Sequence, residues 1–266
     1  MAQQDLITYI SGITLDSFLA DHPRIAEVMA EFAPPQKELN NPLVVLAAES
    51  AYNKNAFAYV CQLAGQIGEN GPYPYRDLVA SQVLAAASVE EGGTLERHFL
   101  NPHASLRIWM MRVAMLRGGK DNQALARVDF ARDACLRMGD IYLWRSADLP
   151  QVGDRYAACM GAHFASEYLA ASHEFPGMVE LFKAEQPALL EYLQSEKEPH
   201  FGFSAADWIE GHPAVEVQHA QYACRAACTA AWRNHDASGF WADFETGFTE
   251  FCRNDQAYFR NLSQVD

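Results

Sequence analysis

The chain has 266 residues, a formal net charge of −14 and a pI of about 5.0. This acidity argues against DNA, RNA and anionic membrane surfaces as partners, because those polyanions attract Lys and Arg. The first residues lack a basic segment followed by an apolar one, and no apolar run has the length of a membrane-spanning helix, so we expect a cytoplasmic protein.

The sequence predicts one helix after another, since Ala, Leu, Gln and Glu are plentiful and alternating β-branched runs are scarce. The expected helices are 15–32, 42–67, 75–91, 103–116, 122–138, 154–172, 178–194, 205–233 and 240–260. Breaks are expected at glycine pairs and at prolines, among them Pro150, Pro176 and Pro199. There is no internal repeat or long linker, so we expect one all-α domain of about eight helices over residues 1–266.

The helix expected at 75–91 ends in two carboxylates, Glu90 and Glu91, before a double glycine. Negative charge at the carboxyl end of a helix is unfavourable, which favours a positive partner there, such as a metal ion. His98 and His103 follow and add two imidazoles. The alternative is that both carboxylates are solvated at an ordinary helix end.

Glu167 lies in a segment of small and apolar residues, 160–171. A carboxylate among Ala, Phe and Leu is costly to bury without a partner, so Glu167 is a candidate metal ligand. His163, one turn earlier, is a candidate for a hydrogen bond that orients a metal-binding side chain. A place on the solvated face of the helix is the alternative for both residues.

The most informative motif is His212, Glu216 and His219, which has the spacing His-x3-Glu-x2-His. On an α-helix these side chains share one face over two turns. Two imidazoles and one carboxylate make three metal ligands, a set that suits iron(II) or manganese better than a closed structural zinc site. Pro213 indicates that the helix begins or kinks directly after His212.

Together these positions resemble the haem-oxygenase-like diiron oxidases and oxygenases, which use a Glu, a His, a Glu on a middle helix and a late His-x3-Asp-x2-His. The matching positions are Glu91 or Glu90, His98 or His103, Glu167, His212, Glu216 and His219. The resemblance covers residues 75–233. Three departures stand out: Glu216 replaces the family's Asp, Pro213 directly follows His212, and the long gap from Glu167 to His212 indicates an inserted turn or helix around 180–200.

The resemblance implies a haem-oxygenase-like helical bundle that binds two iron(II) ions per chain and uses O2 as co-substrate. Known reactions of that family are desaturation, N-oxygenation and oxidative C–C cleavage. We therefore expect a biosynthetic oxidoreductase that acts on a small substrate, an amino acid or an amine-type metabolite. Arg155 and Arg225 are candidates for binding a substrate carboxylate, although surface salt bridges are the commoner role of such residues. Manganese in place of iron, and a homodimer, remain open.

The same residues are compatible with other functions. A ferritin-like carboxylate site needs two Glu-x2-His motifs, and the chain has one, at Glu216 and His219. A cofactorless enzyme or a metal-free helical interaction protein of the same fold would instead keep His212 and His219 as core residues. The six cysteines include no Cys-x2-Cys pair, so we expect reduced, packed thiols.

Overall fold

The computed structural model describes residues 2–32, 39, 41–91, 110, 129–197, 202–232 and 234–263. The helices are α1 (Ala2–Gly12), α2 (Leu15–Asp21), α3 (Pro23–Phe32), α4 (Pro42–Asn70), α5 (Arg76–Glu91), α8 (Asp129–Tyr142), α9 (Arg155–Leu169), the π-helix η3 (Ala170–Glu174), α10 (Phe175–Glu185), α11 (Pro187–Ser195), α12 (Asp207–Glu210), α13 (His212–Ala231) and α14 (Ala237–Leu262). Across these described ranges every regular element is a helix, which confirms the all-α prediction.

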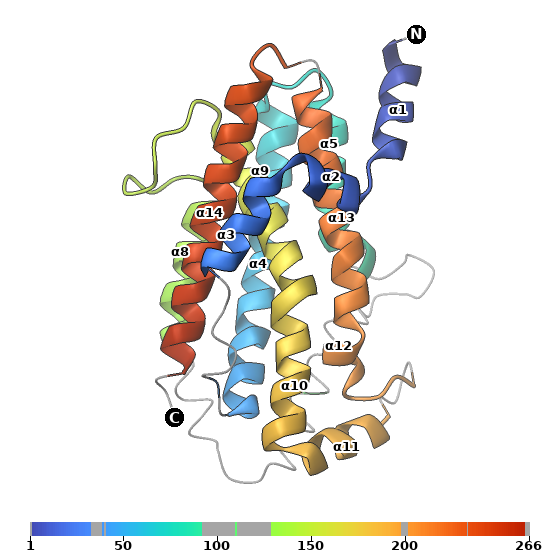
Figure 1. The fold of residues 1–266 in the computed structure, drawn as a ribbon, viewed down its shortest axis with the longest axis vertical. Coiled ribbons are helices and arrows are strands. Elements are labelled where there is room, and N and C mark those ends of the chain that lie inside the picture. The colour runs from blue at the N-terminus through green and yellow to red at the C-terminus, as the bar shows by residue number, and fades with distance from the viewer. Residues whose placement is uncertain are drawn as a thin grey trace.

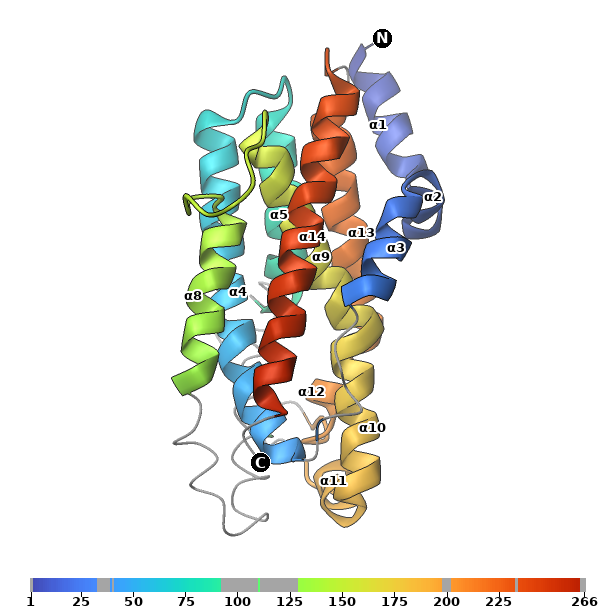
Figure 2. The same ribbon diagram turned by 60° about the vertical axis from the view of Figure 1, so that its left-hand side comes forward.

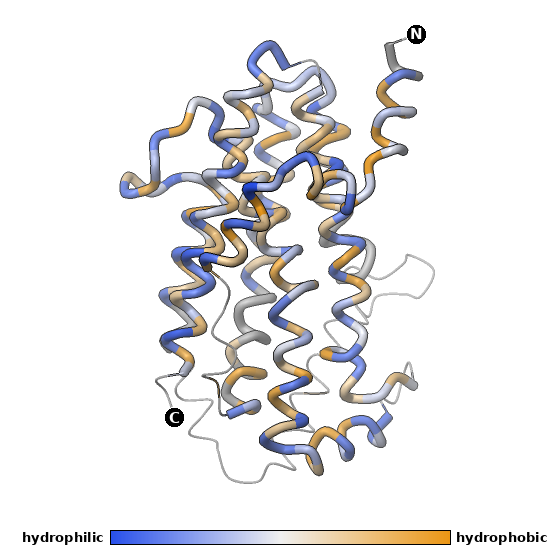
Figure 3. Tube along the Cα trace, viewed as in Figure 1, coloured by the Kyte–Doolittle hydropathy of each residue, from blue (hydrophilic) through white to orange (hydrophobic). Residues whose placement is uncertain are grey.

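The long helices stand side by side along the long axis of the molecule (Figures 1 and 2). Helix α9 packs against both α14 and α13, α5 packs against α4 and α13, and α8 contacts α4 and α14. Hydrophobic and hydrophilic residues alternate along each helix, as expected of amphipathic helices around a shared core (Figure 3). None of the helices that the structure describes is long and apolar enough to cross a membrane.

Helices α9 and α14 approach each other most closely at two glycines. A Cβ atom placed on Gly161 would overlap the backbone carbonyl of Phe244, and one on Gly247 would overlap the carbonyl of Ala158. Backbone atoms cannot move aside as the end of a flexible side chain can, so both positions require glycine. This contact holds α9 against α14 while α9 presents Glu167 to α13.

The start of α9 is fixed by Asp154. Its Oδ1 accepts hydrogen bonds from the backbone N–H groups of Tyr156 and Ala157 at 2.9 and 3.3 Å, which caps the helix. Its Oδ2 accepts a hydrogen bond from the hydroxyl of Tyr73 at 2.8 Å, and its backbone N–H donates to Asp243 at 2.7 Å. Asp154 therefore ties α9 to the connection before α5 and to the first turns of α14.

Several helix boundaries differ from the sequence prediction. The segment expected as one helix at 15–32 is divided between α2 and α3 at His22, before Pro23, and α1 was not predicted. Pro176 does not end a helix, because α9 continues through η3 into α10. The π turn shifts the backbone hydrogen bonds by one residue. Pro176 then lies in the first turn of α10, where the missing N–H of a proline breaks no intrahelical hydrogen bond. The described helical segments therefore outnumber the eight expected.

Helix α13 begins at His212 with Pro213 in its first turn, which was one of the two outcomes predicted for that proline. Proline suits this place because the first turn of a helix has no intrahelical acceptor for its N–H groups. The short α12 ends directly before it, at Glu210, and Gly211 connects the two. The motif therefore occupies the first two turns of α13.

We expect Gly161→Ala to lower the free energy of unfolding by about 3 kcal/mol, because the added methyl group forces α9 and α14 apart. Gly65→Ala in α4 is the matched control. An added Cβ there meets no atom within 4 Å, so the substitution should raise stability by about 0.5–1 kcal/mol through helix propensity. Chemical denaturation measures both effects, and equal changes in the two variants would contradict the close contact.

Candidate metal centre

Two carboxylates and one imidazole converge where α9 packs against α13. Glu167 comes from α9, and Glu216 and His219 come from α13. Nδ1 of His219 lies 2.9 Å from Oε2 of Glu216 and 3.3 Å from Oε2 of Glu167. One ligand atom from each residue lies within 4.8 Å of the others, a spacing that a single metal ion can bridge. The structure thus brings these three predicted ligands together, and their binding of a metal stays a prediction.

Two more histidines flank this cluster, each one turn from a carboxylate on its own helix. Nε2 of His212 lies 3.6 Å from Oε1 of Glu216, and Nδ1 of His163 lies 3.4 Å from Oε1 of Glu167. His212 is held by packing, because its ring stacks on Phe175 with centroids 4.0 Å apart. Both rings are close enough to the carboxylates to join the same centre.

The cluster is buried, and several of its nitrogen atoms have no hydrogen-bond partner. The exposed fractions of the Glu167, Glu216 and His219 side chains are 12%, 6% and 8%. Within the described residues, Nε2 of His219 and both ring nitrogens of His163 lack a hydrogen bond of regular geometry, although Nδ1 of His163 lies 3.4 Å from Oε1 of Glu167. Buried polar atoms normally find a partner, so orphaned imidazole nitrogens beside two carboxylates fit a site that accepts a further group.

The surroundings shift the pKa values of these groups in different directions. Burial raises the pKa of Glu216, an effect that the neighbouring Glu167 charge reinforces. Burial also opposes ionisation of Glu167, but its hydrogen bond with His219 and the nearby His163 hold its pKa below the usual range. Burial lowers the pKa of His163. For His219 burial is outweighed by the hydrogen bonds to Glu167 and Glu216, which raise its pKa to about 11.

These shifts define the charge of the metal-free cluster near neutral pH. The raised pKa values of His219 and Glu216 favour protons on these two groups, whereas the lowered pKa values of Glu167 and His163 favour an ionised carboxylate and a neutral ring. A divalent ion needs deprotonated ligands, so it would take the place of the protons on His219 and Glu216. The cluster can therefore hold either protons or a metal cation.

The remaining predicted ligands cannot all be placed. Glu90 and Glu91 lie in the last turn of α5, a helix that packs along α13, while their side chains lie outside the described residues. His98 and His103 also lie outside the described residues. The backbone of Val83 in α5 lies near the His163 ring, so α5 passes beside the cluster.

The two arginines considered for binding a substrate carboxylate have other roles. Arg225 donates hydrogen bonds from Nε and Nη2 to the carbonyl of Ile13 at 3.4 and 3.3 Å, and so holds the connection between α1 and α2. Arg155 donates to the hydroxyl of Tyr156 at 2.9 Å. It begins α9, about 18 Å along the helix from Glu167 at 1.5 Å per residue. Neither arginine belongs to the cluster.

Sequence reasoning missed three buried polar residues near this part of the core: Tyr142, Glu174 and Asp255. Asp255 follows Phe251 by four residues and precedes Phe259 by four, so it shares their buried face of α14. That spacing was the available signal. Glu174 lies in η3, two turns after Glu167.

The comparisons with known proteins add no further assignment, because no family model, curated protein or solved structure matches the chain. The candidate centre therefore rests on its own residues and distances.

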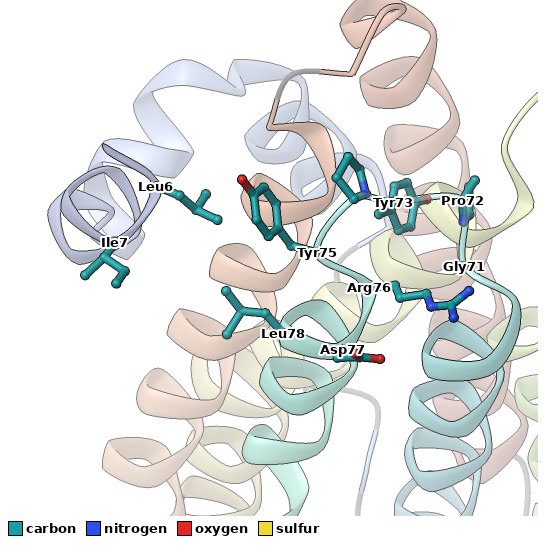
Figure 4. Close-up of a pocket in the computed structure, with 10 residues that line it drawn as sticks. Leu6, Ile7, Gly71, Pro72, Tyr73, Tyr75, Arg76, Asp77 and Leu78 are labelled. Atoms are coloured by element: carbon teal, nitrogen blue, oxygen red, sulfur yellow. The ribbon is translucent and has the colours of Figure 1, made fainter. Parts of the chain in front are cut away.

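A separate groove lies where α1 approaches the connection between α4 and α5 (Figure 4). It has a volume of about 790 Å³ and is lined by Leu6, Ile7 and residues 71–78. No imidazole or thiol lines it, and it shares no residue with the Glu167, Glu216 and His219 cluster. It is therefore not a candidate for the metal centre.

Asp255 predicts a dependence of stability on pH. Its side chain is fully buried, and burial raises its pKa to about 7, a shift that the neighbouring Glu174 only partly opposes. The unfolded chain loses this proton near pH 4, whereas the folded chain keeps it until about pH 7. The folded state therefore loses stability as pH rises from about 4 to about 7.

We expect Asp255→Asn to become more stable than the unsubstituted protein across that pH range, by a difference on the order of 4 kcal/mol at pH 8. Thermal or chemical unfolding at pH 4.5 and pH 8 measures the difference. Asp133→Asn, at an exposed position of α8, is the control and should show no comparable trend. A pH-independent difference between Asp255→Asn and the unsubstituted protein would contradict the assignment.

Proposed function

We propose that this chain is a non-haem iron enzyme that uses O2 to oxidise a small metabolite, an amino acid or an amine. The observation that carries the proposal is the buried convergence of Glu167, Glu216 and His219 from two packed helices. Carboxylate oxygen and imidazole nitrogen together suit iron(II) or manganese. Desaturation, N-oxygenation and oxidative C–C cleavage are the reactions that the sequence resemblance implies.

We propose that the chain binds two divalent ions, as the sequence resemblance implies. Glu167, Glu216 and His219 would provide the first ligands, and His212 and His163 lie next to their carboxylates. Either Glu90 or Glu91, with His98 or His103, would complete the set. The contacts among α5, α9 and α13 support the haem-oxygenase-like arrangement that we propose for the bundle, since these helices carry the matching positions.

When bound, iron(II) would supply electrons for the reduction of O2. The work of the chain is to hold the ligands and to keep water away. Phe175 is fully buried and packs on His212. This apolar neighbour lowers the local dielectric and so strengthens the electrostatic interactions of the cluster.

A metal-free role is the second candidate, and one observation favours it. Protonated His219 lies between two carboxylates, so the cluster can neutralise part of its own charge without a metal. Such an ion pair would serve only to hold α9 against α13. The orphaned nitrogens of His163 and His219 are not explained by that role.

Anaerobic titration with iron(II) tests the proposal. We expect about two ions per chain, and His219→Ala or Glu167→Ala should weaken binding at least about 100-fold, since even indirect ligand partners contribute 10- to 100-fold. His235→Ala and Glu180→Ala, both at exposed positions, are the matched controls and should bind iron normally. Failure of the unsubstituted protein to bind iron would contradict the proposal.

Iron-loaded protein should also consume O2 upon mixing, and this consumption should speed up with a suitable amino acid or amine. The His219→Ala variant should not consume O2 at a comparable rate. Unchanged O2 uptake in that variant would assign the reaction to loosely bound iron instead of the candidate centre.

Metal binding should release protons. Near neutral pH, His219 and Glu216 carry the protons that a dication displaces, so we expect between one and two protons released per ion at this cluster. Calorimetric titration in buffers of different ionisation enthalpy measures that number. Affinity should rise with pH, because the protons compete with the metal. Proton release that does not decrease in His219→Ala would contradict the assignment.

A further inference from the structure

Tyr142, the last residue of α8, is a buried tyrosine whose hydroxyl lacks a partner. Its side chain is fully buried, and within the described residues its hydroxyl forms no hydrogen bond. The ring is fixed by its neighbours: it packs edge-on against Phe251 with centroids 5.8 Å apart and lies 6.0 Å from the ring of His163. The ring of Tyr59 stacks on that of Tyr142 with centroids 6.3 Å apart.

The groups that act on this hydroxyl include both carboxylates of the candidate centre. Burial raises the pKa of Tyr142 well above its usual value, and the charges of Glu167, Glu216 and Glu174 act in the same direction. The hydroxyl therefore keeps its proton and is available as a donor. The side chain of Ser166 lies near this hydroxyl and opposes the shift, but its geometry falls outside that of a regular hydrogen bond.

A buried donor without an acceptor is unfavourable for folding, and phenylalanine would fill the same space without that cost. The ring of His163 links this hydroxyl to the cluster, because it lies 6.0 Å from the Tyr142 ring and its Nδ1 lies 3.4 Å from Oε1 of Glu167. An unsatisfied O–H therefore lies in the same part of the core as the two converging carboxylates. The missing acceptor is best explained by a group that enters the site. An oxygen or nitrogen atom of a small anionic ligand is the acceptor that such a donor suits.

We propose that the hydroxyl of Tyr142 donates a hydrogen bond to a small anion or a water-derived oxygen held at the Glu167, Glu216 and His219 cluster. The inference rests on the proposed metal centre and adds to it a residue that positions the incoming ligand. Tyr142 is then a positioning residue that does not itself bind metal. Its hydrogen bond would orient the ligand and favour its anionic form.

Azide binding to the cobalt(II)-loaded protein tests this inference. Cobalt(II) reports both its own binding and the arrival of azide through its visible absorption, and azide is an anion with terminal nitrogens that accept hydrogen bonds. We expect Tyr142→Phe to bind cobalt with nearly unchanged affinity but azide about tenfold more weakly, as for the loss of one hydrogen bond to a charged acceptor. The metal-free variant should melt at the same temperature as the unsubstituted protein or higher.

Two variants serve as controls for Tyr142→Phe. Tyr59→Phe removes a hydroxyl from the stacked neighbouring ring, and Ser166→Ala removes the nearby hydroxyl. Both should leave azide affinity unchanged. An equal loss of azide affinity in Ser166→Ala would show that Tyr142 acts on Ser166, and would overturn the inference.

The outcomes separate this inference from the proposed function. Equal azide affinity of Tyr142→Phe and the unsubstituted protein, with cobalt bound to both, contradicts the role of Tyr142 alone. Loss of cobalt affinity without loss of azide affinity shows that the hydroxyl serves a carboxylate ligand, which also overturns the inference. Failure of the unsubstituted protein to bind cobalt contradicts the metal centre itself.

Discussion

The arrangement of this protein depends on the burial of two carboxylates at one helix interface. Glu167 and Glu216 face each other between α9 and α13, with His219 between them. Burying such charges is costly unless protons, imidazolium groups or a metal cation compensate them. The contrary pKa shifts of the two carboxylates follow from this constraint, because one of them ionises more readily when the other remains protonated.

The rest of the bundle keeps this interface in place. The glycine contact with α14 fixes α9 on the side away from the cluster. The cap at Asp154 fixes the beginning of α9. On the other side, Pro213 starts α13 at His212, so that the motif lies in its first two turns. The π turn η3 begins three residues after Glu167 and lets the same helical run continue past the site, a place where such turns are often functional.

The sequence was informative where spacing determines geometry. The i, i+4 and i+7 spacing of His212, Glu216 and His219 placed them on one helix face, and the small, apolar neighbours of Glu167 pointed to its burial. The all-α class followed from composition. These features are local, so they can be inferred without knowing how the helices pack.

Features that depend on packing could not be predicted in the same way. Tyr142 lies on a helix far from the motif in sequence, and only the packing of α8 brings it near Glu167 and His163. Arg225 and Arg155 looked suitable for a substrate carboxylate until the structure showed that they bond to Ile13 and Tyr156. Pro176 indicated a break, but the preceding π turn accommodates it.

The most direct test of this account is anomalous diffraction at the iron absorption edge from crystals grown anaerobically with iron(II). We expect an anomalous peak enclosed by Glu167, Glu216 and His219, with the His219 proton replaced by the metal. A structure in which His219 still bonds both carboxylates, with no anomalous peak between α9 and α13, would contradict it.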